Sequence, residues 1–217
     1  AQRDGLLEDV LRAPAEQTPG QGIAAAVATL PDDITHLWIL HDDLEVTPDS
    51  LHQMLVEVSR APIADVAFPT LLRPAMRNYP EFIAEQGQTL STAGSRVLPV
   101  IDRGDIDQHQ GEPVRILGGS TAGMFLSLAA WRRVGGLDPA IPLFRDGVEF
   151  GWRANEAGLV VRTAPSCAIH HRQVGRGWAR QSVLAPRPDL VDRLAGMRMI
   201  AARSGSVGRT TFALMLQ

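Results

Sequence analysis

The chain has 217 residues, of which 45% are hydrophobic and 21% are charged. This composition supplies enough apolar material for a packed core and excludes a disordered tail, a collagen-like fibre and a disulfide-stapled miniprotein. The net charge of -3 gives no electrostatic basis for a nucleic-acid partner. All 21 basic residues are arginine, which excludes Schiff-base lysine chemistry and a P-loop lysine. The single cysteine, Cys167, excludes an internal disulfide and favours a cytosolic compartment.

The N-terminal part of the chain predicts helices that alternate with short strands. Thr47 can cap a helix whose first residue is Pro48, and apolar residues continue from there at helical spacing. Short apolar runs bounded by polar residues or proline predict buried strands. We therefore expect helices at 6–12 and 23–30, a strand at 37–40, a helix beginning at 47–50, and a strand at 63–68.

The same alternation resumes after an irregular, polar stretch over 71–113. We expect strands at 89–92, 97–101, 114–117, 123–128, 159–162 and 168–170, and helices at 129–134, 148–157 and 188–203. Strands that alternate with helices predict an α/β layered domain with a mostly parallel mixed sheet flanked by helices. We assign residues 1–185 to this domain and 186–217 to a C-terminal helical segment that can lead to a further region.

Membrane insertion has little support in the sequence. No run of 18 apolar residues occurs, so these residues contain no complete membrane span. The apolar stretch at 211–216 can be the frayed end of a helix or the approach to a membrane segment of a longer polypeptide.

Three polar residues, His41, Asp42 and Asp43, follow the apolar run at 37–40. Open α/β sheets bind ligands at the carboxyl ends of their strands. Adjacent carboxylates repel each other unless a cation or a proton neutralises them, and Mg²⁺ or Mn²⁺ takes carboxylate oxygens while leaving positions for phosphate oxygens. A solvated turn in which an Asp caps the next helix explains the same residues, so both interpretations stay open.

Two further groups of residues can carry chemistry. Asp146 and Glu149 stand near one helix start, either as a general base for a bound hydroxyl or as a variant of the capping box. His170 and His171 end a strand, and because strand neighbours face opposite sides, at most one of them can face a given site. Neutral imidazole is a good ligand for Mn²⁺ or Zn²⁺, although a surface histidine is an equal alternative.

The order of these segments along the chain is more informative than any single one. In sequence they are His41-Asp42-Asp43, Ser120 to Leu126, Val134 to Asp138, Phe144 to Asn155 and Ala164 to His171. This succession, over about residues 20–171, resembles family-2 glycosyltransferases of the GT-A fold. It is most similar to the large membrane-associated members found in actinobacteria.

The resemblance implies a role for each matching residue. Asp43 falls on the last metal-binding Asp of the family's DxD motif, with Asp42 beside it and His41 in place of the first acid. His171 falls on a histidine that can bind the metal or the diphosphate. The remaining residues that the resemblance places at the donor or acceptor are Gly123, Met124, Trp152 and Arg153.

The chain departs from the family pattern in two places. The family has an acidic pair before its Val-Asp-Leu segment, and the second acid of the pair is usually the catalytic base. That position is Gly147 here, so the base is Asp146 or Glu149, or catalysis is weak or lost. Little sequence precedes the helix expected at 23–30, so we expect the nucleotide-binding part at the N-terminus to be incomplete.

The resemblance therefore implies an inverting glycosyltransferase. It would move a sugar from a nucleotide-diphosphate donor to a glycan or lipid-linked acceptor, with a Mn²⁺ or Mg²⁺ ion as cofactor, in cell-envelope polysaccharide synthesis. We expect a cytoplasmic location at the inner face of the membrane, with membrane association through regions outside this chain and no nucleic-acid partner. One alternative is a domain of the same fold that binds a nucleotide sugar or glycan with little turnover, because Gly147 replaces an acid. Another is a metal-dependent phosphohydrolase or nucleotidyltransferase that uses the same pair of aspartates, Asp42 and Asp43.

Overall fold

The computed structural model describes residues 17–74, 77–102, 104–108, 111–141, 143–173 and 185–203. The helix expected at 6–12 and the apolar stretch at 211–216 lie outside these ranges. The helices are α1 (Pro19–Val27), α2 (Ser50–Ser59), α3 (Leu128–Val134), α4 (Asp146–Glu156) and α5 (Pro188–Arg203). The strands are β1 (His36–Trp38), β2 (Leu44–Glu45), β3 (Val66–Leu72), β4 (Ile83–Glu85), β5 (Thr89–Leu90), β6 (Arg96–Val97), β7 (Phe125–Ser127) and β8 (Val161–His171).

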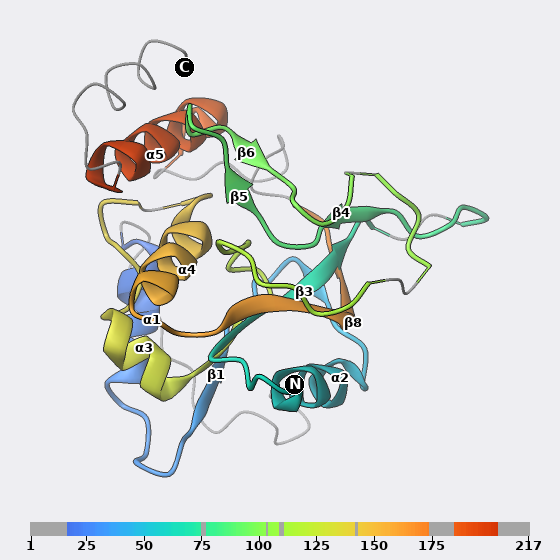
Figure 1. Ribbon diagram of the computed structural model, residues 1–217, viewed down its shortest axis with the longest axis horizontal. Helices are drawn as coiled ribbons and strands as arrows, with labels where there is room; N and C mark the ends of the chain where they lie inside the picture. The colour runs from blue at the N-terminus through green and yellow to red at the C-terminus, as the bar shows by residue number, and fades with distance from the viewer. Residues whose placement is uncertain are drawn as a thin grey trace.

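A central mixed sheet of six strands organises the molecule (Figure 1). Its order is β1-β7-β3-β8-β2, with β4 paired to β3, and β5 and β6 form a separate two-stranded sheet. Among the described strands only β3 and β8 pair in parallel, and the remaining pairs are antiparallel. The predicted α/β layering is confirmed, whereas the predicted predominance of parallel pairing is wrong, because most neighbouring strands here run in opposite directions.

Strand β8 differs most from the sequence prediction. The strands expected at 159–162 and 168–170 are one strand of 11 residues, Val161–His171. A register shift between Pro69 and Thr70 of β3 lets the parallel pairing continue past Pro165. The strand therefore carries His171 to the far end of the sheet, where it pairs with Leu44.

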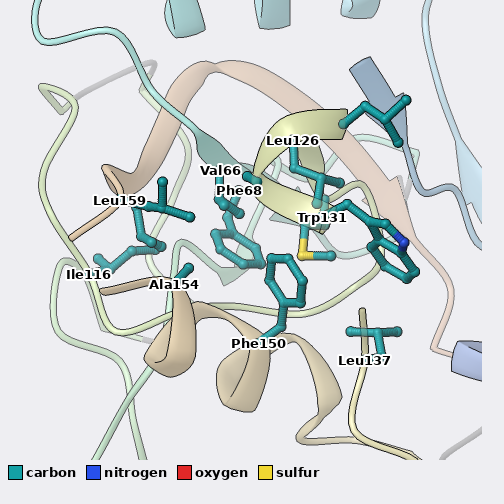
Figure 2. Close-up of a cluster of buried hydrophobic side chains, with 13 residues drawn as sticks. Val66, Phe68, Ile116, Leu126, Trp131, Leu137, Phe150, Ala154 and Leu159 are labelled. Atoms are coloured by element: carbon teal, nitrogen blue, oxygen red, sulfur yellow. The ribbon is translucent and has the colours of Figure 1, made fainter. Parts of the chain in front are cut away.

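Strand β3, in the middle of the sheet, is buried on both faces. All seven residues of β3 are buried, and because successive side chains alternate between faces, Phe68 joins the cluster with α3 and α4 while Ala67 joins the cluster with α2 (Figure 1). In the first cluster Trp131 of α3 stacks on Phe150 of α4, with ring centroids 5.9 Å apart (Figure 2). Burial on both faces is typical of a strand with a largely apolar sequence, and β3 continues past the strand expected at 63–68, through Pro69 to Leu72.

Helix α4 packs unusually close to the backbone of the 117–121 segment. A Cβ added at Gly147 would lie 2.9 Å from the backbone nitrogen of Thr121 and closer still to the carbonyl oxygen of Gly119. One turn later, a Cβ at Gly151 would lie 2.7 Å from the Cα of Gly118. Glycine at these two positions lets the helix approach, so Gly147 has a packing function that no acidic residue could share in this backbone arrangement.

Helix α5 is attached to α4 by apolar and ionic contacts. Ala195 and Met199 pack with Val148 of α4 in a small buried cluster. The carboxylate of Asp192 receives hydrogen bonds from Arg145, which directly precedes α4. The boundary expected between residues 185 and 186 stays a prediction.

We expect Gly147→Ala to destabilise the fold by about 1–3 kcal/mol, because an added methyl group must displace backbone rather than a side chain. The free energy of unfolding from urea titration measures the effect. The matched control is Gly158→Asn, at the opposite end of α4, where φ is +76° and nothing lies within 4 Å of an added Cβ. Equal stability of the two variants would contradict the close packing of α4.

Candidate functional site

Pairing between β2 and β8 assembles the site. Leu44 is the cross-strand partner of His171, and the backbone N–H of Arg172 donates to the carbonyl of Asp43 at 3.1 Å. The Asp43 side chain consequently lies next to His171, with Oδ1 3.3 Å from Nε2. The turn that contains Asp43 and the end of β8 are far apart in the sequence, and the sheet edge brings them together.

His41 completes the group. Its ring lies edge-on to that of His171, with centroids 5.9 Å apart. One ligand atom from each of His41, Asp43 and His171 lies within 4.8 Å of the others. The turn is held at this place by antiparallel pairing just before it, since the N–H of Gly123 donates to the carbonyl of Ile39 at 2.9 Å.

These three side chains suit a divalent cation. The Asp43 side chain is only 8% exposed, so its carboxylate benefits from a positive partner. Burial lowers the pKa of His41, and the Asp146 carboxylate partly opposes this effect. The lowered pKa favours the neutral imidazole, the form that can bind a metal. Two imidazoles and one carboxylate fit Mn²⁺ or Zn²⁺ better than Ca²⁺, which prefers oxygen ligands alone.

Asp42 lies outside the group of three. The sequence predicts it as a metal ligand with Asp43 and His171, and the structure places it at an exposed position next to Asp43. His41, which the sequence predicts at the donor, is the third member of the group.

Asp146 is linked to this group through Thr121. The Thr121 hydroxyl donates to Oδ2 of Asp146 at 3.3 Å and lies 3.1 Å from Nε2 of His41. The backbone N–H of Gly147 donates to Oδ1 of Asp146 at 3.1 Å. Burial raises the pKa of Asp146, with His41 and these hydrogen bonds opposing the rise, so the carboxylate is a better proton acceptor than an ordinary aspartate.

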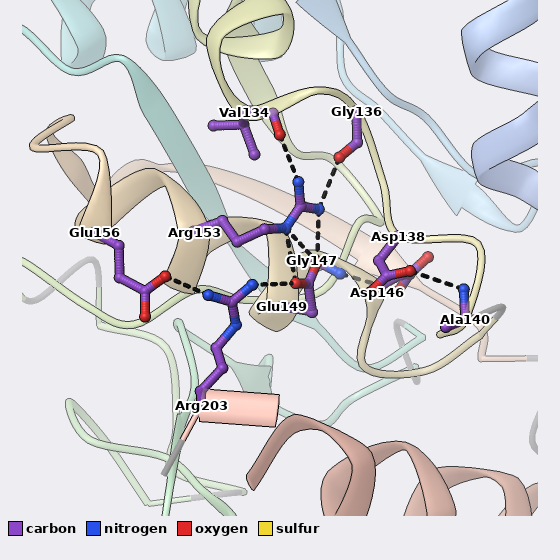
Figure 3. Close-up of polar contacts among 10 residues, drawn as sticks. All are labelled: Val134, Gly136, Asp138, Ala140, Asp146, Gly147, Glu149, Arg153, Glu156 and Arg203. Carbon is purple, nitrogen blue, oxygen red and sulfur yellow. Dashed lines mark hydrogen bonds and ion pairs between the residues drawn. The ribbon is translucent and has the colours of Figure 1, made fainter. Parts of the chain in front are cut away.

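Glu149, the other carboxylate considered as a base, is engaged in ion pairs (Figure 3). Both of its carboxylate oxygens accept from Arg153, and Arg203 of α5 donates to Oε1 at 3.1 Å. Arg153, which was expected at the donor or acceptor, also donates to the carbonyls of Val134 and Gly136. Both side chains thus join α3, α4 and α5, and neither is in the group of His41, Asp43 and His171.

The other residues expected at the ligand also have packing roles. Met124 has no exposed surface and lies in the core cluster. Trp152 packs against the cluster that joins α4 and α5. Gly123 has a φ of +81°, and its carbonyl accepts from the indole of Trp38 at 3.1 Å, which fixes the chain before His41.

Thr121 and Glu85 are not among the residues that the sequence predicts for the site. Glu85 is 4% exposed, and its Oε1 accepts the backbone N–H of Ser120 at 2.7 Å. Nothing in the local sequence indicates either contact, because each partner comes from a distant part of the chain.

The comparisons with known proteins support the fold. No known family profile matches the sequence, and no curated protein matches it. Among solved structures, the chain is similar to GalNAc-T7 crystallised with UDP, GalNAc and Mn²⁺, with a TM-score of 0.54 and 12% identity. The match covers 75% of this chain but only 32% of the GalNAc-T7 chain. The protein accordingly has a GT-A-like fold, as the sequence predicted.

We expect Asp146→Asn to stabilise the metal-free protein at pH 7. A buried carboxyl group with a raised pKa favours the folded state when protonated, and this contribution is lost as the pH rises through the folded-state pKa. Asparagine removes the buried charge and can still bond Gly147 and Thr121. Urea titrations in the presence of EDTA should show a higher free energy of unfolding for the variant than for the wild type at pH 7, and a smaller difference toward pH 4. A variant less stable than the wild type at pH 7 would contradict the raised pKa.

Proposed function

We propose that this chain is the GT-A-like domain of a metal-dependent glycosyltransferase that inverts the anomeric centre of a nucleotide-diphosphate sugar. The main support is one juxtaposition. The group of His41, Asp43 and His171, which could hold a cation, is connected to the buried carboxylate of Asp146 by two hydrogen bonds through Thr121. The fold that carries them is similar to that of a protein crystallised with UDP, GalNAc and Mn²⁺.

Each part of the site has a chemical task in this proposal. When bound, a divalent cation neutralises charge on the diphosphate leaving group. His41, Asp43 and His171 hold that cation at the edge of the sheet. Asp146 accepts the proton of the acceptor hydroxyl as the oxygen attacks the anomeric carbon from the face opposite the leaving group, and such a base contributes roughly 10²–10⁴-fold to the rate.

Asp146 is the better candidate for the base on three grounds. In the part of the chain that the structure describes, its carboxylate is joined to the cation-binding group through Thr121 and accepts hydrogen bonds from neutral donors only, whereas the oxygens of Glu149 form ion pairs with Arg153 and Arg203. Burial makes Asp146 more basic. Glycine at 147 is explained by the packing of α4, so its presence there is no sign of lost catalysis and lends no support to the alternative of a binding domain without turnover.

The finer parts of the proposal depend on the sequence resemblance alone. These are the placement in family 2, the likeness to large actinobacterial members, the glycan or lipid-linked acceptor, the role in cell-envelope polysaccharide synthesis and the location at the cytoplasmic face of a membrane. Among the residues that the structure describes, no helix is both long and apolar enough to cross a bilayer.

Replacing the carboxylate ligand should abolish cation-dependent binding of a nucleoside diphosphate. Loss of a residue that only supports a metal ligand typically weakens metal binding roughly 10–100-fold. Asp43 is a proposed ligand itself, so we expect Asp43→Ala to weaken Mn²⁺-dependent UDP binding by more than this, as measured by calorimetric titration. The matched control is Asp42→Asn, at the exposed neighbouring position, which should bind nearly as the wild type does. Comparable binding by Asp43→Ala and the wild type would remove the proposed cation site.

The two candidate bases should separate in kinetics. We expect Asp146→Asn to lower kcat by about 10²–10⁴-fold while UDP binding persists, because only the proton acceptor is lost. Glu149→Gln should retain turnover and lose stability instead, since it weakens ion pairs with two arginines. Release of UDP from a panel of UDP-sugars, with and without glycan acceptors, measures the rate.

The opposite pattern would transfer the role of base to Glu149. Acceptor-independent cleavage of the diphosphate linkage, with no sugar transferred, would instead identify a phosphohydrolase.

A further inference from the structure

We propose that Thr121 is a positioning residue that couples the carboxylate of Asp146 to the cation-binding group by fixing the tautomer of His41. The inference rests on the proposed function, since it assigns His41 to a cation and Asp146 to the proton. Thr121 itself touches neither the cation nor a substrate in this scheme.

The geometry places one hydroxyl between two functional side chains. Thr121 Oγ1 lies 3.1 Å from Nε2 of His41 and 3.3 Å from Oδ2 of Asp146. Thr121 is 4% exposed and Asp146 is 6% exposed, so water molecules can hardly compete for either hydrogen bond. The three residues come from the 41–43 turn, the segment before β7 and the start of α4.

The donor and acceptor roles follow from the number of protons. A threonine hydroxyl has a single proton, and an ionised carboxylate can only accept. With Asp146 ionised, as a base must be before reaction, Thr121 donates to Asp146 and must accept at His41. Nε2 of His41 then carries the proton, which leaves the lone pair on Nδ1 as the one that could bind a cation.

The segment that carries Thr121 is itself held in place. The preceding N–H, of Ser120, donates to the buried carboxylate of Glu85 at 2.7 Å. The carbonyl of Thr121 accepts from the N–H of Met124 at 3.2 Å. On the other side, Gly147 lets α4 pack directly against the Thr121 backbone. The hydroxyl therefore stands at a fixed place, and supporting partners so fixed commonly set the orientation of metal-binding histidines.

The tautomer can be read directly in the unmodified protein. In metal-free protein labelled with ¹⁵N-histidine, long-range ¹H–¹⁵N spectra should show His41 protonated at Nε2, with the signal assigned by its loss in His41→Gln. A His41 ring protonated at Nδ1 would overturn the inference without any variant of Thr121 having to fold.

A pair of variants tests the effect on cation affinity. Thr121→Val removes the hydroxyl and keeps the shape, and we expect it to weaken Mn²⁺ binding, titrated without nucleotide, by about 10–100-fold. Thr121→Ser keeps the hydroxyl and should bind Mn²⁺ nearly as the wild type does. A merely structural threonine would affect neither the Mn²⁺ affinity nor the His41 tautomer.

The failures of the two proposals are distinguishable. If Asp43→Ala loses Mn²⁺ binding while Thr121→Val binds as tightly as the wild type, the role of Thr121 is overturned and the cation site stands. If the wild-type protein binds no Mn²⁺ with or without UDP, the proposed function is overturned and the role of Thr121 with it.

Discussion

Leu44 and His171 face each other across the β2–β8 pair, and the position of the site depends on this pairing. It brings the residue before Leu44, Asp43, to within 3.3 Å of the His171 ring. The pairing exists because β8 runs without interruption for 11 residues, past a register shift where it meets β3. A shorter β8 would leave His171 away from the turn, and the three possible ligands would not meet.

A second constraint acts at the start of α4. Gly147 and Gly151 face the backbone of 117–121, so the helix can approach without side chains between them. That approach brings Asp146 within hydrogen-bonding distance of Thr121. Two arginines of this region, Arg145 and Arg153, donate to carboxylates and carbonyls of neighbouring elements. These contacts hold the residues around Asp146 in place and have no part in the proposed sugar transfer.

The ionised carboxyl group of Asp146 lowers the stability of the fold, because it is buried and its pKa is raised. A chain selected for stability alone would place a neutral residue there. Glu149 is also buried, but two guanidinium groups balance its charge. Within the described residues, the two acids, three residues apart on one helix, therefore differ in their partners: Glu149 is paired with arginines, and Asp146, the proposed base, is not.

The amino-acid sequence predicts the alternation of helices and strands, the long closing helix over 188–203, and Asp43, His171 and Asp146 as residues to examine. These predictions follow from local patterns: hydrophobic period, caps and polar residues after apolar runs. The GT-A-like architecture was implied by the resemblance to a known family. Strand direction, the grouping of His41 with Asp43 and His171, the burial of Met124 and the ion pairs of Glu149 were decided by the tertiary structure. So was the bridge through Thr121. Their causes are contacts between residues far apart in the chain, and no local pattern of amino acids records which distant backbone or side chain will lie within 3 or 4 Å.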